Sequence, residues 1–390
     1  MLSLRFASTA LYQTLGAVTG ALFVPLVISR CGMADFAMVA LFHSCTTLQW
    51  PLFDLGLDQY GALTLPQQQG QARNKLEGQF WTIRTTASGF LGVVSIVACV
   101  IAPSGSLVSV FLPRLWCYGA LCALFPSWHF TASLQPQRLA LGNTLARMGT
   151  LLVYWWVPSS AWLWAIDVQL LGCLLYAGYG LSLGRTTLRL HKSGLRTLLK
   201  NAWPHALQQH LPSAIPQLLL LQMGALWGIA SLGVYGLVDR LLRLVLQLQQ
   251  PILHTILALT ASRPSTKIRA LLTTWGAIIT LVMVAAAPVG LSLITNAPVS
   301  RYLWPCLAVG CIPALEAVNQ CTGLSTIGVW STLRCQGVGA LTGVVWMLAS
   351  YQMGYPIEAG CIAACLSSLT AWGFLRRLRS RSSEARGEVS

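Results

Sequence analysis

Long runs of apolar residues, separated by short polar segments, extend through the whole of this 390-residue chain. Only 9% of the residues are charged, whereas a soluble domain carries about 25%. So few charged side chains cannot cover a surface that faces water. Runs of about 20 apolar residues cross a lipid bilayer as helices, because a helix satisfies its own backbone hydrogen bonds. The sequence therefore predicts an all-α, polytopic membrane protein.

The apolar runs predict about twelve transmembrane helices, at about 20 residues a span. The expected spans are 5–29, 36–63, 79–102, 107–130, 138–157, 161–184, 202–226, 230–261, 268–294, 301–324, 332–351 and 356–375. The first run is longer than the apolar part of a signal peptide and a second run follows at once, so we interpret it as a span. Pro126 and Pro136 interrupt the region between the fourth and fifth spans.

Basic residues concentrate in every second connection between the predicted spans. These connections and the C-terminal tail contain Arg73, Lys75, Arg138, Arg185, Arg189, Lys192, Arg196, Lys200, Arg263, Lys267, Arg269, Arg334, Arg376, Arg377, Arg379, Arg381 and Arg386. The alternate connections contain little beyond Arg30, Arg114 and Arg301. Connections rich in Lys and Arg stay in the cytoplasm, which places both termini and segment 185–200 there. The net charge of +15 then reflects orientation in the bilayer, and we expect no nucleic-acid partner.

The chain divides near residue 200 into two sets of six predicted helices. A short motif, Leu-Gln-Trp-Pro at Leu48–Pro51, recurs as Leu-Gln-Gln-Pro at Leu248–Pro251, within the second helix of each half. Such repeats are typical of transporters whose halves are related by an axis along the membrane normal, with the substrate site between them. We expect an N-terminal lobe at 1–200, a C-terminal lobe at 201–378 and a cytoplasmic tail at 379–390.

The cysteines and histidines form no recognisable site. Most of the twelve cysteines lie in or beside apolar runs, and none forms a pair of CxxC motifs. His205 and His210 are five residues apart, which is the wrong spacing for one face of a helix. The outer connections are short, and they contain no nucleophile–base set. We therefore expect that the protein is not an enzyme and has neither a metal site nor a cofactor.

Ionisable residues inside the predicted spans are the candidates for function, because each costs about 2.5–3.5 kcal/mol at a helix centre. In the eighth span, Asp239 lies four residues before Arg243, a spacing that favours an ion pair along one helix face. No acidic residue lies three or four positions from Arg240, which we interpret as a cation in a water-filled lumen. Arginine suits phosphate because its planar guanidinium stays protonated and donates two parallel hydrogen bonds.

Two further arginines, Arg84 and Arg147, lie inside the third and fifth spans. Arginines near a helix end can extend to the membrane surface, and this is the interpretation we favour for Arg84. Arg147 lies deeper in its span, so extension to the surface and a place in the lumen are equally open. Arg240, Arg147, Arg243 and Arg84 are together the candidate substrate-binding cations.

Four acidic residues are candidates for ion coupling or for contact with sugar hydroxyls. Asp54 and Asp58, four residues apart, share one face at the end of the second span. They either bind a coupling proton or Na⁺ or, as the slightly favoured interpretation, form a solvated helix end. Glu316 lies in the middle of the tenth span, and Asp239 is the acidic residue of the eighth.

Five short segments carry motifs that occur together in one known family of membrane proteins. They are Pro25–Gly32, which ends Arg-Cys-Gly; Asp54-Leu55-Gly56; Pro126–Phe130, which begins Pro-Ser-Trp; Gly233-Val234-Tyr235, followed by Asp239-Arg240; and Pro251. In these segments the chain resembles the bacterial polysaccharide flippases, the O-antigen branch of the MATE-like exporter superfamily. The chain departs from that family in two places. The acid–lysine pair of the family is Asp239-Arg240 here, and Gln135 and Gln137 stand near the position of a glutamate that often follows the tryptophan motif.

The resemblance implies a MATE-like fold and a flippase in the bacterial inner membrane. Its substrate would be an oligosaccharide repeat unit on undecaprenyl pyrophosphate, moved by alternating access, with lumen arginines binding the pyrophosphate. Contact with the polysaccharide polymerase machinery and coupling to H⁺ or Na⁺ are further expectations. The alternatives are a MATE-type exporter of drugs or other small molecules, and a membrane-embedded polymerase or ligase, which the short outer connections disfavour.

Overall fold

The computed structural model of the chain is helical throughout its described part. It describes residues 2–243, apart from 134, 158–160, 185–189, 230 and 242, and short stretches between 274 and 373, of which 287–295 is the longest. Every regular element in these stretches is an α-helix or a short 3-10 helix. The predicted all-α class is therefore confirmed. The seventh predicted span lies within the described residues, the eighth is described only as far as residue 243, and most of the last four lies outside them.

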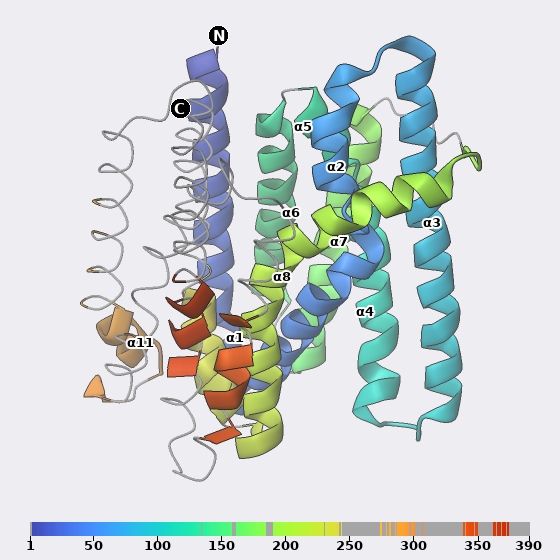
Figure 1. Cartoon of the computed structure of the whole chain (residues 1–390). Coiled ribbons are helices and arrows are strands. Elements are labelled where there is room, and N and C mark those ends of the chain that lie inside the picture. The colour runs from blue at the N-terminus through green and yellow to red at the C-terminus, as the bar shows by residue number, and fades with distance from the viewer. Residues whose placement is uncertain are drawn as a thin grey trace, which may run out of the picture. The chain divides into compact units, whose positions relative to one another are not determined.

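The first helix, α1 (Leu2–Asp54), contains the first predicted span and most of the second (Figure 1). Gly32 interrupts it with a φ of 82° and a ψ of 174°, a backbone conformation that glycine adopts without the strain that a Cβ would cause. This break falls between the first two predicted spans. The second span ends earlier than predicted, because a left-handed turn at Leu55 and Gly56 separates α1 from the short helix α2 (Leu57–Thr64).

The α-helices after α2 overlap the predicted spans. After the short 3-10 helix η1 (Leu65–Gln67), they are α3 (Gly70–Ile101), α4 (Leu107–Ala123), α5 (Ser127–Ala132), α6 (Pro136–Trp156), α7 (Trp162–Gly184), α8 (Leu195–Trp227) and α11 (Ala287–Thr295). However, α3 and α8 begin at Gly70 and Leu195, well before the predicted starts at 79 and 202. The predicted fourth span is divided between α4 and α5 at Pro126, because proline lacks the N–H that a continuing helix needs. Pro136 stands at the first position of α6, where that N–H would have no partner within the helix.

Four helical stretches in the described part of the chain are long and apolar enough to cross a membrane. They are Ala7–Asp54, Gly70–Ile101, Leu107–Ala132 and Trp162–Leu183. Ala7–Asp54 has 48 residues, and Gly32 divides it into two passes of about one span each. Large apolar side chains of α3, such as Phe90, Val100 and Ile101, are more than half exposed, as expected of a surface that faces lipid.

The chain packs into two compact units. Unit 1 comprises Met1–Cys31 and Phe42–His210, and unit 2 comprises Gly32–Leu41 and Leu211–Ser390. Both α1 and α8 therefore contribute residues to each unit. The predicted lobes at 1–200 and 201–378 were divided by counting helices along the chain, and that division stays a prediction.

An apolar cluster in unit 1 joins segments that are far apart in the sequence. Its buried members are Leu57, Leu65, Phe80, Trp81, Ile83, Trp128, Ala132, Leu198 and Ala202. They come from α2, η1, α3, α5 and the start of α8, so burying them fastens these helices to one another. Close van der Waals contact between these side chains favours the packing of helices that lipid surrounds.

In unit 2, small residues allow close helix packing. A Cβ on Gly233 would lie 3.0 Å from the Met33 carbonyl oxygen, and one on Gly236 would lie 2.8 Å from the Cβ of Ala40. Glycines let helix backbones approach closely inside a membrane. The part of α1 that belongs to unit 2 therefore packs directly on the helical residues 231–241.

Candidate functional site

The candidate site begins at the backbone turn that ends α1. Leu55 and Gly56 have φ values of 52° and 78°, in the left-handed region. The Asp54 carboxylate stabilises this turn, because its Oδ2 accepts a hydrogen bond from the Gly56 N–H at 3.1 Å and its Oδ1 accepts one from the Asp58 N–H at 3.2 Å. Short acidic side chains commonly hold turns in this way. The turn thus fixes the buried Asp54 carboxylate against the start of α2.

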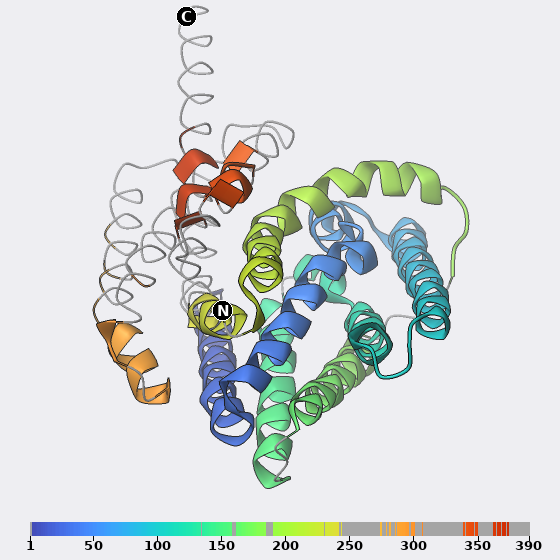
Figure 2. The same ribbon diagram turned by 90° about the horizontal axis from the view of Figure 1, so that it is seen from below.

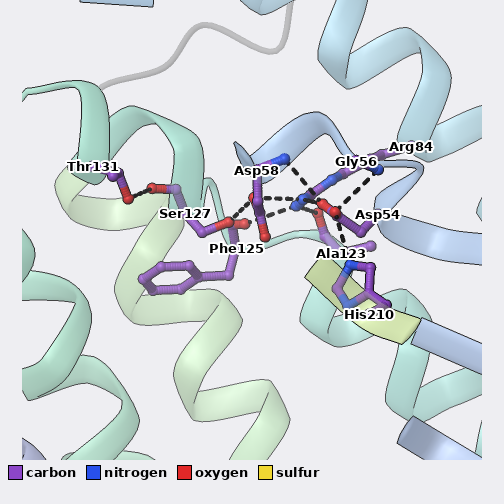
Figure 3. Close-up of polar contacts among 9 residues, drawn as sticks. All are labelled: Asp54, Gly56, Asp58, Arg84, Ala123, Phe125, Ser127, Thr131 and His210. Carbon is purple, nitrogen blue, oxygen red and sulfur yellow. Dashed lines mark hydrogen bonds and ion pairs between the residues drawn. The ribbon is translucent and has the colours of Figure 1, made fainter. Parts of the chain in front are cut away.

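The guanidinium of Arg84, on α3, lies between the carboxylates of Asp54 and Asp58 (Figure 3). Its Nη2 donates to an oxygen of Asp54 and, at 2.7 Å, to Oδ1 of Asp58. Its Nη1 donates to the carbonyl oxygens of Ala123 and Phe125, at 3.2 and 3.1 Å. Carbonyls at the end of a helix have no partner within it, so Arg84 also satisfies acceptors at the end of α4.

Aromatic side chains shield this guanidinium from solvent. The Cζ of Arg84 lies 4.2 Å from the ring centre of Trp128 and 5.9 Å from that of Trp50. Trp128 is fully buried, and the Arg84 side chain is only 1% exposed. A cation over an aromatic face gains electrostatic stabilisation, which is larger where water is excluded. The ion pairs of Arg84 are therefore buried interactions.

Two further helices contribute polar side chains to the site. The Ser127 hydroxyl, on α5, donates to Oδ1 of Asp58, and Nε2 of His210, on α8, lies 3.2 Å from Oδ2 of Asp54. Figure 3 shows both side chains directed at the carboxylates. We refer to Asp54, Asp58, Arg84, Ser127 and His210 as the buried charge cluster. It connects α1, α2, α3, α5 and α8 within unit 1.

The buried charge cluster contains two carboxylates and one guanidinium. With Asp54 and Asp58 ionised and His210 neutral, it would carry one net negative charge in a place that little water reaches. An uncompensated buried charge is energetically costly. One proton, on His210 or on a carboxylate, removes that net charge, so the arrangement is chemically able to take up and release a proton.

Two expectations about these residues are wrong. Arg84 does not extend to the membrane surface, because its guanidinium is held by Asp54 and Asp58 inside unit 1. The two aspartates do not form a solvated helix end either, since their side chains are 0% and 17% exposed. The physical reason is the left-handed turn after Asp54, which ends α1 early and directs both carboxylates toward α3.

The eighth predicted span carries the ion pair that its spacing predicted. Nε of Arg243 donates to Oδ2 of Asp239 at 2.8 Å, and the Gln217 side chain reaches the same oxygen at 3.4 Å. Arg240, in the same helix, is half-buried. Glu316 lies outside the described residues. That any of these residues contacts a substrate or a coupling ion stays a prediction.

Arg147 points toward the first half of α1. Its Nη1 donates to the Gly16 carbonyl oxygen at 3.1 Å, and its Nε donates to the Asn143 side-chain oxygen at 3.2 Å. A Cβ on Gly20 would lie 3.2 Å from this Nη1, so the absence of a side chain at Gly20 leaves the space that the guanidinium occupies. The side chain is half-buried within unit 1, and both of these acceptors are uncharged.

Sequence reasoning missed two members of the buried charge cluster. His210 lies inside a predicted span, and an ionisable residue at such a position is a usable signal, but its spacing from His205 bears only on metal binding. Ser127 carried no signal of its own, because a hydroxyl is common in membrane helices. In the described residues, no group of three or more His, Cys, Asp or Glu side chains is arranged to hold a metal ion.

The apolar helices and their packing define a multi-pass, all-α membrane protein. No family model and no curated protein sequence matches the chain. Solved structures do match it, although at low sequence identity, and they identify the fold as the one shared by MATE transporters and the flippase MurJ. The predicted MATE-like fold is thereby confirmed.

Three solved structures illustrate this likeness. An inward-facing multidrug resistance MATE family transporter of the MOP superfamily is 12% identical, with a TM-score of 0.68 over 96% of both chains. The lipid II flippase MurJ, in an inward closed conformation, is 9% identical, with a TM-score of 0.66 over 95% of this chain and 86% of that one. The MATE multidrug transporter DinF-BH, solved as a complex, is 13% identical, with a TM-score of 0.64 over 97% of this chain and 95% of that one.

Proposed function

We propose that this protein is a flippase of the bacterial inner membrane. Its substrate is an oligosaccharide repeat unit of O-antigen or a similar surface polysaccharide, linked to undecaprenyl pyrophosphate. The observation that carries the proposal is the fold shared with a lipid II flippase over 95% of the chain. The motifs that resemble polysaccharide flippases support the choice of substrate.

The chemistry of such a substrate requires cations within the membrane helices. Pyrophosphate and sugars cannot enter hydrocarbon alone, because burying charged and unpaired polar groups is too costly. Arginine suits this task, since it stays protonated and forms charge-assisted hydrogen bonds with phosphate oxygens. Arg147 in unit 1 and Arg240 and Arg243 in unit 2 are the cations that we propose for it. Rocking of the two halves would then alternate access to the bound headgroup.

Arg147 is the best described of these cations. Its hydrogen bonds to Gly16 and Asn143 end on uncharged oxygens, whereas a phosphate would add attraction between opposite charges and can accept two parallel hydrogen bonds from a guanidinium. A phosphate that reached Arg147 would therefore compete well with both acceptors. Gly20 lies beside the guanidinium, where a larger side chain would crowd it.

Replacing Arg147 by Ala is expected to lower surface polysaccharide at least roughly tenfold, the effect of losing about 1.4 kcal/mol of phosphate binding. The measurement is polysaccharide on cells of a deletion strain that carries the variant, normalised to the amount of protein in the membrane. Arg138→Ala on the same helix is the control, because Arg138 is exposed. Normal polysaccharide at a normal protein level would exclude Arg147 from substrate binding. The same assay tests Arg240→Ala, for which we expect loss of polysaccharide.

A second candidate function is export of drugs or other small molecules, which the likeness to two multidrug MATE transporters favours. Deleting the gene distinguishes the two functions. The flippase predicts loss of surface polysaccharide with unchanged drug resistance. Drug sensitivity with intact polysaccharide would instead support the exporter.

We also propose that the buried charge cluster couples transport to H⁺, with Na⁺ as the alternative ion. Replacing Asp58 by Asn preserves the size of the side chain and an oxygen for Ser127 but removes the ionisable group. Transport into proteoliposomes by this variant is expected to lose its acceleration by a pH gradient and to keep a slow basal rate. An unchanged response to the pH gradient would exclude Asp58 as the coupling group. If Na⁺ is the coupled ion instead, transport by the wild-type protein is accelerated by a Na⁺ gradient, and Asp58→Asn loses that acceleration.

A further inference from the structure

The first turns of α8 form an amphipathic helix on unit 1. Leu198, Ala202 and Ala206, spaced four residues apart, are buried, and the first two belong to the apolar cluster. A Cβ on Gly56 would lie only 2.2 Å from the Ala202 carbonyl oxygen, so α2 and α8 are in direct backbone contact. One face of this helix is therefore fixed to the bundle, and the opposite face is available for other contacts.

Hydrogen bonds hold the segment before α8 beside residues 79–82 of α3. The His191 N–H donates to Oγ1 of Thr82 at 2.8 Å, and the Gln79 side chain donates to the Ser193 carbonyl oxygen. At this level α3 changes in character: the sequence before Phe80 is polar, and the sequence after it is mainly apolar. From Phe80 to the end of α3 at Ile101 the helix extends for roughly 32 Å, close to the ~30 Å thickness of the hydrocarbon core.

The segment that leads into α8 consequently lies at the boundary between membrane and water. Figures 1 and 2 show the first half of α8 running crosswise to the long helix α3, the orientation of a helix that follows a membrane surface. The boundary is the cytoplasmic one by the positive-inside rule, because Arg73 and Lys75 precede it on α3.

The solvent-facing side of this segment is basic. Lys192 stands in the turn before α8, and Arg196 and Lys200 follow one turn apart on the helix; all three are exposed. Trp203, one turn further on, is 41% exposed. We refer to these four residues as the basic edge. Like charges four residues apart on a helix repel each other, and an anion bound between Arg196 and Lys200 would relieve that repulsion.

We propose that the basic edge binds the headgroups of anionic phospholipids in the cytoplasmic leaflet. Amphipathic helices that lie in a membrane interface combine an apolar face with Lys and Arg on the polar face. Trp203 fits the same partner, because tryptophan is favoured at the level of the headgroups. A bound lipid would hold the start of α8 in place beside Gly56 and the buried charge cluster. The proposal does not depend on which substrate the protein transports.

The test compares lipid affinities of the full-length protein in detergent, measured by native mass spectrometry with phosphatidylglycerol and with phosphatidylcholine. The variant Arg196→Gln/Lys200→Gln is expected to bind phosphatidylglycerol roughly 25-fold more weakly, at about fivefold for each cation near an anionic surface. The control Lys75→Gln/Arg138→Gln removes one lysine and one arginine from exposed positions elsewhere on the cytoplasmic side. It is expected to change the affinity less than twofold.

Three results would overturn the proposal. In the first, both double variants weaken the binding of phosphatidylglycerol equally. In the second, wild-type protein binds phosphatidylcholine as tightly as phosphatidylglycerol, so that headgroup charge is not recognised. In the third, inorganic pyrophosphate displaces phosphatidylglycerol at a similar concentration, which would assign the basic edge to a soluble or substrate phosphate. A selective loss in the Arg196→Gln/Lys200→Gln variant, with pyrophosphate ineffective, would establish the lipid site.

Discussion

Replacing Arg84 by Ala is expected to lower the free energy of unfolding by about 3–5 kcal/mol, the cost of removing one partner from a buried ion pair. The guanidinium contacts two carboxylates, those of Asp54 and Asp58, and two carbonyl oxygens, and its side chain is 1% exposed. Without it, both carboxylates lose their cation in a place that little water reaches. We expect a much lower yield of membrane-inserted protein and a fall of several degrees in the thermal unfolding midpoint in detergent.

The pair of Arg114 and Asp167 provides a matched control. Its two nitrogen–oxygen contacts measure 2.7 and 3.3 Å, but the two side chains are 27% and 37% exposed. Partly exposed pairs contribute about 1 kcal/mol or less, so Arg114→Ala is expected to lower the midpoint much less than Arg84→Ala. An equally small effect of Arg84→Ala would show that the ion pairs of Arg84 do not stabilise unit 1.

A compensated variant separates charge from packing. In Arg84→Met/Asp54→Asn/Asp58→Asn, no charge remains on the three side chains, and the two amides keep oxygens that can accept hydrogen bonds from Gly56 and Ser127. Replacing a buried ion pair by neutral residues is often close to neutral for stability. The triple variant is therefore expected to be more stable than Arg84→Ala. If it is less stable, lost packing rather than buried charge explains the result.

Replacing Gly56 by Ala is expected to cost roughly 2–5 kcal/mol, the sum of left-handed backbone strain and overpacking. The added Cβ would lie 2.2 Å from the Ala202 carbonyl oxygen and 2.5 Å from the Ala206 nitrogen, and both are backbone atoms that cannot rotate away. Gly56 itself has a φ of 78°. The start of α8 would have to move off α2, which would also disturb the contact between His210 and Asp54.

Gly32→Ala is the control for this prediction. Gly32 has a similar φ of 82°, but no atom lies within 4 Å of the position that its Cβ would take. Only backbone strain applies there, of roughly 1–3 kcal/mol, because Gly32 has a ψ of 174° and lies in a region that is nearly confined to glycine. The thermal unfolding midpoints of both variants in detergent measure the difference. Equal midpoints would mean that the close approach of α2 and α8 does not contribute to stability.

Local pattern was enough to predict most of the helices and one of the ion pairs. The lengths of the apolar runs predicted membrane-spanning helices, because a chain surrounded by lipid must satisfy its backbone hydrogen bonds within helices. The pair of Asp239 and Arg243 followed from a spacing of four residues, since helix geometry alone brings such side chains together. The sequence also showed that Arg84, Asp54 and Asp58 are ionisable residues inside predicted spans. Such residues are costly there unless they face a partner, a cavity or an interface.

The partners of these groups could be known only from the tertiary structure. Arg84 contacts Asp54 and Asp58 across 30 and 26 residues of chain, Ser127 contacts Asp58 across 69, and His210 contacts Asp54 across 156. No periodicity spans such distances. Whether an arginine reaches the membrane surface or turns inward depends on which helices pack beside it and on the left-handed turn that redirects the chain after α1. Composition and spacing determined which solvent this protein faces, and packing determined which of its buried charges meet.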